Sequence, residues 1–281
     1  MKKLEIPLKN ISVKTIFEDC NKSYTVSKKH FDCNKYLPKI IYYTIIYQNH
    51  VPNNIPALKQ DNLFKENDED KKLLIDYYKN KFVTVPDIRK KYYDVIKANA
   101  KGVCPICGRG SILTLDHYLP KANYPLLCLS PINLIPCCRD CNTNKLDFNP
   151  TIYLEAPIHP YLEEIDEIWL EVDITFKDDS FECQYKAVHK NITYKKRLDN
   201  FLKLYKLDYL FPLCCIPEID SCKKMLKKLV EKDNSLDLLK ERLTETIDSY
   251  QDEDINSWKS ALYRGLLKNI DDFANWLRLY G

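Results

Sequence analysis

The sequence predicts an α+β protein that is mainly helical, with a small cysteine-rich segment between two helical regions. Apolar residues recur at helical spacing before residue 100 and after residue 191, and an alternating pattern near residues 168–188 indicates a β-hairpin. Residues 102–150 combine turn residues with six of the twelve cysteines. The predicted regions are residues 1–103 (helical and basic), 104–155 (cysteine-rich) and 156–281 (a hairpin followed by helices).

Two helices are predicted in the first region. Residues 70–78 form the clearest amphipathic stretch, and residues 85–100 form a second one that opens with Val-Pro-Asp. The residues of the second helix expected to share one face are Ile88, Tyr92, Val95 and Ile96.

The last region is predicted to begin with the hairpin and to continue as helices. Residues 169–176 alternate in polarity, residues 177–180 supply a turn, and the chain returns up to Val188. Three apolar stripes follow, and amphipathic helices normally bury such stripes in a core. The stripes contain Leu226, Leu229 and Val230; Leu239, Leu243, Ile247 and Tyr250; and Trp258, Leu262, Leu266, Ile270, Phe273, Leu277 and Tyr280.

The composition excludes several classes of protein. Of 281 residues, 45% are apolar and 30% are charged, which is typical of a folded globular chain and excludes a disordered polyelectrolyte or a disulfide-linked miniprotein. The net charge is +3, but the first 103 residues carry +8 and residues 156–281 carry −5. A basic first region is compatible with a phosphate-binding face.

The sequence also predicts a cytoplasmic protein with no membrane partner. The start of the chain is charged and polar, unlike a secretory signal. The longest apolar run, residues 40–47, is far shorter than the roughly 20 residues that span a bilayer. Twelve cysteines in such a protein are expected to be mostly reduced, so their spacing raises the question of a metal site.

Two cysteine pairs predict a zinc site. Cys104-Pro-Ile-Cys107 and Cys138-Arg-Asp-Cys141 each place two thiolates on one turn, and two such turns complete a tetrahedral four-sulfur site. Cys137 adjoins Cys138, but only Cys138 keeps the spacing to Cys141. Because a site with four protein ligands has no open position, this Zn²⁺ is expected to be structural.

Polar residues between and after the two pairs could carry out hydrolysis. Asp116 and His117 are adjacent, and a carboxylate can hold a hard divalent ion while a neutral imidazole takes a proton from water. Neighbouring residues of a strand point to opposite faces, so a turn or kink is needed for both to address one substrate.

The order of these motifs resembles the HNH endonuclease family. The motifs are Cys-x2-Cys, Asp-His-x-x-Pro-Lys, Asn-Leu and Cys-x2-Cys-Asn-x-x-Lys, and they occupy residues 104–149, about one sixth of the chain. The resemblance implies a ββα-metal finger: a hairpin that carries Asp-His, a loop that carries the middle Asn, and a short helix that carries the last motif residue.

The resemblance also implies a role for each matching residue. His117 corresponds to the general base, Asp116 and Asn142 to the ligands of a catalytic Mg²⁺ or Mn²⁺, and Asn133 to the residue that ties the loop to the hairpin. Asn142 stands where many members have His, and its oxygen ligand favours Mg²⁺ or Mn²⁺ over a softer ion. The expected phosphate contacts are Lys121 and Lys145.

The sequence thus predicts a metal-dependent endonuclease that hydrolyses phosphodiester bonds, with DNA as the expected substrate and RNA as an open alternative. The same segment is similar to the HNH subunits of Septu-type antiphage systems, which implies a partner ATPase docked by the C-terminal helices and the Trp258 stripe. The alternative function is a zinc-ribbon module that binds nucleic acid or protein without cleaving it. The sequence does not predict the oligomeric state.

Overall fold

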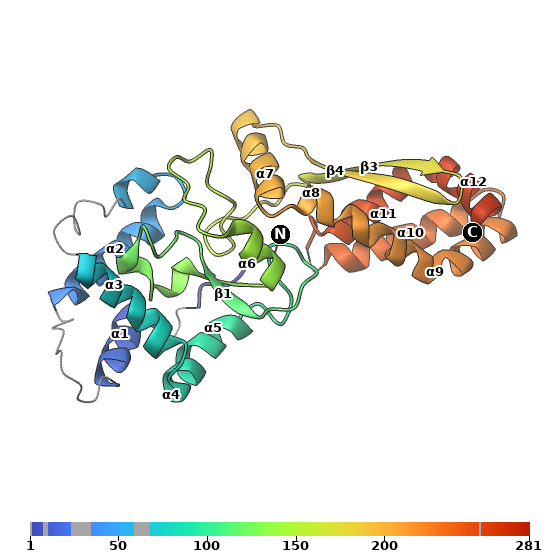
Figure 1. The fold of residues 1–281 in the computed structure, drawn as a ribbon. Coiled ribbons are helices and arrows are strands. Elements are labelled where there is room, and N and C mark those ends of the chain that lie inside the picture. Colours follow the sequence, from blue (N-terminus) through green and yellow to red (C-terminus); the bar gives the residue numbers. More distant parts are fainter. Residues whose placement is uncertain (1, 8–10, 24–34, 59–67, 253) are drawn as a thin grey trace. The chain divides into compact units, whose positions relative to one another are not determined.

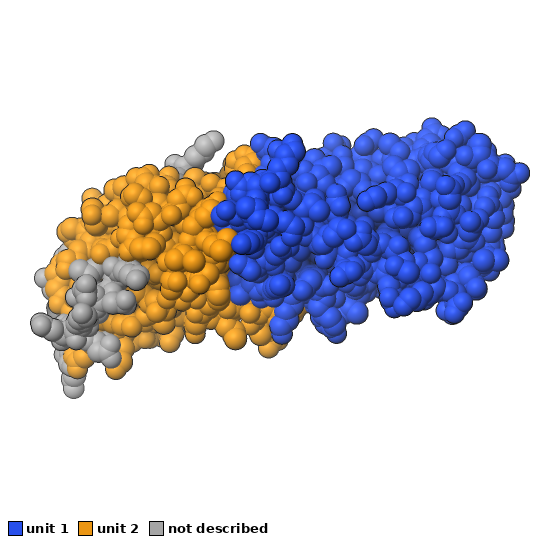
Figure 2. Space-filling model, turned by 90° about the horizontal axis from the view of Figure 1, so that it is seen from above, with its two compact units in different colours: residues 1–2, 165–281 blue, residues 3–164 orange. Residues whose placement is uncertain are grey.

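The computed structural model describes residues 2–7, 11–23, 35–58, 68–252 and 254–281 (Figure 1). The chain divides into two compact units: unit 1 comprises residues 1–2 and 165–281, and unit 2 comprises residues 3–164 (Figure 2). Within the described ranges the fold is mainly helical, and each unit contains one two-stranded antiparallel sheet. The mainly helical α+β prediction is therefore confirmed. None of the described helices is long and apolar enough to cross a membrane.

Unit 2 consists of short helices and a small sheet. Its elements, in chain order, are α1 (Val13–Lys22), α2 (Leu37–His50), η2 (Ile55–Leu58), α3 (Asp68–Tyr77), η4 (Tyr78–Phe82), α4 (Pro86–Ile88), η5 (Arg89–Tyr93), α5 (Asp94–Ala98), β1 (Thr114–His117), η6 (Pro125–Leu127), η7 (Pro131–Asn133), β2 (Leu134–Cys137) and α6 (Arg139–Lys145).

Both predicted helices of the first region contain a π-helical turn. Helix α3 continues into the π-helix η4, and a second π-helix, η5, lies between α4 and α5. A π-turn inserts one residue and changes which side chains face the core. Tyr93 is therefore buried, whereas Val95 is 50% exposed, so the prediction that Val95 shares the buried face is wrong.

A single hydrophobic core joins the N-terminal helices to the cysteine-rich segment. Phe17 of α1 stacks on Tyr77 of α3 with ring centroids 5.5 Å apart. The same cluster of buried residues includes Leu115 of β1 and Leu134 of β2. Burial of these side chains stabilises both regions at once, because about 25 cal/mol is gained for each Å² of apolar surface removed from water. The core thus extends across residue 103.

The sheet of unit 2 is short and leads directly into α6. Strands β1 and β2 pair antiparallel, with Asp116 opposite Ile135 and His117 opposite Leu134. Cys138 follows β2 and is the N-cap residue of α6, where its sulfur accepts a hydrogen bond from the Cys141 N–H. The order strand, strand, helix therefore brings the end of β1 close to α6.

Unit 1 contains the predicted hairpin and the C-terminal helices. Its elements are β3 (Leu170–Lys177), β4 (Ser180–Ala187), α7 (Ile192–Leu204), α8 (Leu207–Leu210), α9 (Pro212–Lys232), α10 (Asp237–Gln251), α11 (Trp258–Lys268) and α12 (Ile270–Tyr280). Helix α11 packs on β3 (Figure 1). Gly265 permits this close approach, since a Cβ there would lie 2.5 Å from a Val172 methyl carbon.

The third apolar stripe is divided between two helices. Asn269 ends α11, where its side-chain amide donates to the Gly265 carbonyl at 2.9 Å, and α12 begins at the next residue. The core members of the stripe are Trp258, Leu262, Leu266, Phe273 and Leu277, all buried in unit 1. The core interpretation is confirmed for these residues.

Candidate functional site

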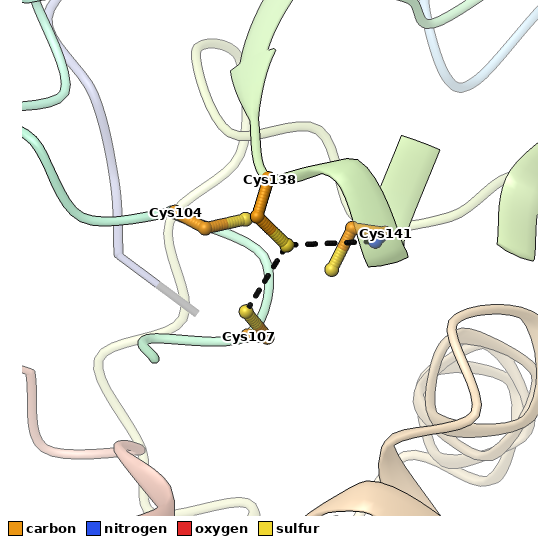
Figure 3. Close-up of side chains that lie close together, drawn as sticks. All are labelled: Cys104, Cys107, Cys138 and Cys141. Atoms are coloured by element: carbon orange, nitrogen blue, oxygen red, sulfur yellow. Dashed lines mark hydrogen bonds between the residues drawn. The ribbon is translucent and has the colours of Figure 1, made fainter. Parts of the chain in front are cut away.

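Four buried cysteines form a cluster that could hold zinc. The Sγ atoms of Cys104, Cys107, Cys138 and Cys141 all lie within 4.8 Å of one another (Figure 3). The Cys107 and Cys138 sulfurs are 3.8 Å apart. A tetrahedral ion with Zn–S bonds of about 2.3 Å requires sulfurs about 3.8 Å apart, so the donor set fits Zn²⁺.

The backbone around the cluster explains why the sequence needs glycine there. Gly108 has φ +65°, a left-handed conformation that glycine adopts without strain, and its N–H donates to the Cys104 carbonyl at 2.8 Å. At Gly110 a Cβ would lie 2.5 Å from the Cys138 Cβ. The two glycines therefore allow the first cysteine pair to close against the second.

Cys138, and not its neighbour Cys137, belongs to the cluster. The Cys137 sulfur lies 3.5 Å from the Thr114 hydroxyl, and burial raises the pKa of Cys137 to about 12. Within the cluster, hydrogen bonding from Cys104 and the other thiols lowers the pKa of Cys107. The sulfur set chosen from the x2 spacing is confirmed by this geometry.

A polar pocket of 260 Å³ lies where β1 ends beside α6. Four of the predicted site residues line it together: Asp116, His117, Lys121 and Asn142. Its other lining residues are Pro120, Thr143, Leu146 and Asp147. Asp116 and His117 are the last residues of β1, and neighbouring side chains of a strand point to opposite faces. Because the pocket lies at the end of the strand, both side chains can line it.

His117 is held in one tautomer. It is 5% exposed, and its Nε2 lies 3.0 Å from the Cys128 carbonyl oxygen. A carbonyl can only accept, so Nε2 carries the proton and Nδ1 carries the free electron pair. Burial lowers the pKa of His117 to about 3, which keeps the ring neutral at ordinary pH. The Tyr78 ring meets the imidazole edge-on, with centroids 4.4 Å apart.

Asp116 is paired with a buried lysine. The Lys145 ammonium lies 3.0 Å from Asp116 Oδ2 and also donates to the His117 carbonyl at 2.7 Å. Burial raises the pKa of Asp116, and the charge of Lys145 opposes that shift. Lys145 is 2% exposed, so its placement differs from the phosphate contact suggested by the sequence. Lys121, in contrast, lines the pocket.

The two asparagines occupy different positions. Asn133 is fully buried outside the pocket lining, where its side chain accepts from the Leu119 N–H at 2.8 Å and donates to the carbonyls of Leu119 and Leu127. It thereby joins the loop after β1 to η7. Asn142 donates its amide to the Thr114 hydroxyl at 3.0 Å, so its Oδ1 is the atom that could bind an ion.

Several partners of these residues were not predicted from the sequence. Tyr78, Thr114 and the Cys128 carbonyl have no local motif that marks them, because they reach the site only through the fold.

His159 lies two residues before the buried Tyr161 and is itself fully buried. Its Nδ1 accepts from the Tyr161 N–H at 3.1 Å and its Nε2 lies 2.9 Å from the Tyr47 hydroxyl, so it has a structural role.

Comparison with known proteins gives one partial similarity. The chain is 34% identical over 116 residues to Protein ea31 of Escherichia phage lambda. The match covers 41% of this chain, and the chain spans about a third of the length of that relative. No protein-family model matches the chain, and no solved structure matches it.

Proposed function

We propose that the protein is a metal-dependent nuclease that hydrolyses phosphodiester bonds in DNA. The observation that carries this proposal is the pocket shared by Asp116, His117 and Asn142, next to Lys121. It combines a carboxylate and an amide oxygen, which suit a hard divalent ion, with a neutral imidazole and a cation. Metal-assisted hydrolysis of a phosphodiester can use each of these groups.

The local fold supports assignment of this segment to the ββα-metal arrangement of HNH nucleases. Strands β1 and β2 precede α6, and the four-cysteine cluster joins the segment before β1 to the start of α6. Asp116 and His117 end the first strand, and Asn142 lies in the helix. In this proposal the zinc is structural, because its four sulfur ligands leave no open position.

The chain's own residues supply most of the proposed mechanism. Asp116 and Asn142 would hold Mg²⁺ or Mn²⁺, which when bound would neutralise charge that develops on the phosphate and on the leaving oxygen. His117 would accept a proton from water at Nδ1 while its Nε2–H continues to donate to the Cys128 carbonyl. General-base catalysis of this kind contributes about 10²- to 10⁴-fold in rate.

We propose DNA as the substrate. RNA is the alternative, and the assay must distinguish cleavage of DNA from cleavage of RNA. Lys121 would contact a phosphate at the pocket. The net charge of +8 on the first 103 residues would add to the attraction of a polyanion. Both features respond to phosphate and neither distinguishes the two sugars, so matched DNA and RNA strands should be compared.

The test is cleavage of supercoiled plasmid and of single-stranded DNA and RNA with Mg²⁺, Mn²⁺ or EDTA. Wild type should cut with a divalent ion and not with EDTA. His117→Ala should lower the cleavage rate at least about 100-fold because it removes the proposed base. His50→Ala, at the end of α2, is the matched control and should cut as wild type does.

Zinc content per chain should be measured for every variant, so that loss of activity is separated from loss of fold. If zinc-loaded His117→Ala cuts as fast as wild type, the nuclease proposal fails. A wild type that binds DNA but does not cut it under any of these conditions would favour a zinc-ribbon binding module.

A role in antiphage defence beside an ATPase is a separate proposal, supported by the sequence resemblance of residues 104–149. Affinity purification of the chain from its native host should recover a stoichiometric ATPase. Absence of any ATPase from the purified material, with the nuclease intact, would contradict it.

A further inference from the structure

Two π-helical turns bring tyrosine hydroxyls to the strand that carries Asp116 and His117. Tyr78 begins η4 and Tyr93 ends η5. The Tyr78 hydroxyl donates to the Leu115 carbonyl at 3.4 Å, and the Leu115 N–H donates to the Tyr93 hydroxyl at 3.2 Å. Both backbone polar groups of Leu115 are therefore bonded to side chains of the N-terminal region.

The position of Leu115 explains why these two bonds matter. It lies opposite Pro136 of β2, but its N–H and carbonyl point away from β2. Backbone polar groups alternate between the two edges of a strand, and Tyr118, three residues further on, donates its N–H toward β2 to the Asn133 carbonyl. Leu115 is 4% exposed, so water is not an easy substitute, and a buried backbone group without a partner costs free energy. Leu115 directly precedes Asp116, so any movement of its backbone is passed to the pocket.

The same tyrosines belong to a packed row of aromatic rings that ends at His117. Tyr93 packs edge-on against Phe82, with centroids 5.9 Å apart, and Phe82 stacks on Tyr78 at 5.6 Å. Tyr78 in turn contacts the His117 ring at 4.4 Å. The π-turns make this row, since the inserted residue in each changes which side chains face inward.

We propose that Tyr78 and Tyr93 are positioning residues that hold β1, and with it Asp116 and His117, in the geometry that cleavage requires. This inference rests on the proposed nuclease function. Neither tyrosine lines the pocket, so neither would touch the substrate. Their effect would fall on the rate of the chemical step and not on DNA binding.

The chain offers a matched control in the neighbouring tyrosine. Tyr77 is also buried, but its hydroxyl donates to Asn21 of α1 at 3.0 Å. Tyr77→Phe therefore removes a buried hydroxyl from the same stretch of helix without removing a bond to β1. Comparison with Tyr77→Phe separates positioning of the strand from general loss of stability.

The test is steady-state cleavage of DNA by zinc-loaded full chains with Mn²⁺. Tyr93→Phe leaves the Leu115 N–H unpaired and should lower kcat about tenfold, with KM changed less than about twofold. Tyr78→Phe loses a longer bond and should lower kcat less, whereas Tyr78→Leu also loses the ring against His117 and should lower it more. Tyr77→Phe should keep the wild-type kcat.

A second readout does not depend on cleavage. Hydrogen exchange of the Leu115 amide should be about tenfold faster in Tyr93→Phe than in wild type or Tyr77→Phe. If wild type does not cut nucleic acid, the nuclease proposal fails and this exchange rate alone decides whether the strand is held as inferred. Unchanged exchange, a wild-type kcat in Tyr93→Phe, or an equal loss of kcat in Tyr77→Phe would overturn the inference.

Discussion

His117 shows how one buried side chain can link the proposed chemistry to stability. Its Nε2–H donates to the Cys128 carbonyl, and burial lowers the pKa of the imidazole from 6.5 to about 3. In the unfolded chain the imidazole would take up a proton below pH 6.5, while the folded protein does not. The unfolded state therefore binds more protons in this window, and stability falls as the pH falls from about 6.5 toward 3.

This difference predicts a pH-dependent effect of removing the ring. Between pH 8 and pH 5.5 the free energy of unfolding of wild type should fall by about 1.4 kcal/mol more than that of His117→Gln. Urea unfolding of the zinc-loaded proteins at the two pH values measures this difference. Both chains contain the four-cysteine cluster, so any effect of pH on that cluster is common to the two. His50→Gln should follow wild type. Parallel losses in wild type and His117→Gln would contradict the prediction.

The Lys145–Asp116 pair predicts a large effect of breaking one buried ion pair. Lys145→Met would leave the buried Asp116 carboxylate without its counterion and should destabilise the fold by about 3–5 kcal/mol. Asp116→Asn combined with Lys145→Met removes both charges and should recover part of that loss without restoring cleavage. Equilibrium unfolding in urea measures each variant.

An exposed pair provides the control for this prediction. Lys91 and Asp19 are 2.6 Å apart, but the Lys91 side chain is 61% exposed, so Lys91→Met should cost far less than Lys145→Met. Equal losses for the two lysine variants would show that Lys145 is not a structural counterion. A double variant as unstable as Lys145→Met would lead to the same conclusion.

At the scale of elements, the two cysteine turns should make folding of unit 2 depend on zinc. Cys138→Ser should bind much less than one zinc per chain and unfold at a lower temperature, because four-sulfur sites contribute folding free energy. Cys137→Ser should keep one zinc per chain, since its sulfur faces Thr114. Zinc content and thermal unfolding measure both variants, and similar zinc loss in the two would contradict the assignment.

The sequence predicted elements whose signal is local. The paired cysteines identified the four sulfurs that cluster and could hold zinc, and the alternation of residues 169–176 identified the β3–β4 hairpin, because spacing and turn residues decide both. The third apolar stripe showed no sign of the break at Asn269, since helical periodicity continues across it. The π-turns were equally hidden, because one inserted residue changes which side chains face the core without changing composition.

The candidate site was predictable only in part, because some of its contacts depend on tertiary packing and not on local sequence. Asp116, His117 and Asn142 belong to sequence motifs, and the structure places them around one pocket. The buried position of Lys145 depends on how α6 packs against β1, and the contact of Tyr78 with His117 joins residues 39 positions apart. Contacts that depend on tertiary packing leave no periodic or spacing signal in a single sequence.

At the scale of the whole molecule, the candidate site belongs to unit 2 alone. The cysteine cluster, the pocket, and the partners Cys128, Thr114 and Lys145 all lie between residues 3 and 164. Unit 1 has its own core, in which α11 packs on β3 and Phe273 stacks with Trp276 at 6.2 Å. Each unit therefore has a core of its own, and the residues of the proposed chemistry all lie in unit 2.

This separation predicts that a chain of residues 3–164 folds with one zinc and keeps the nuclease activity proposed for the full chain. Its rate constant for cleavage should lie within about threefold of the full-length value, because no hydrogen bond described for the site residues comes from residues 165–281. Zinc content, circular dichroism and single-turnover cleavage of the two chains measure it. A truncated chain that is unfolded or free of zinc would show that unit 1 is needed for stability. A folded, zinc-loaded truncated chain that cuts at least 100-fold more slowly would instead show that unit 1 supplies a group used in catalysis.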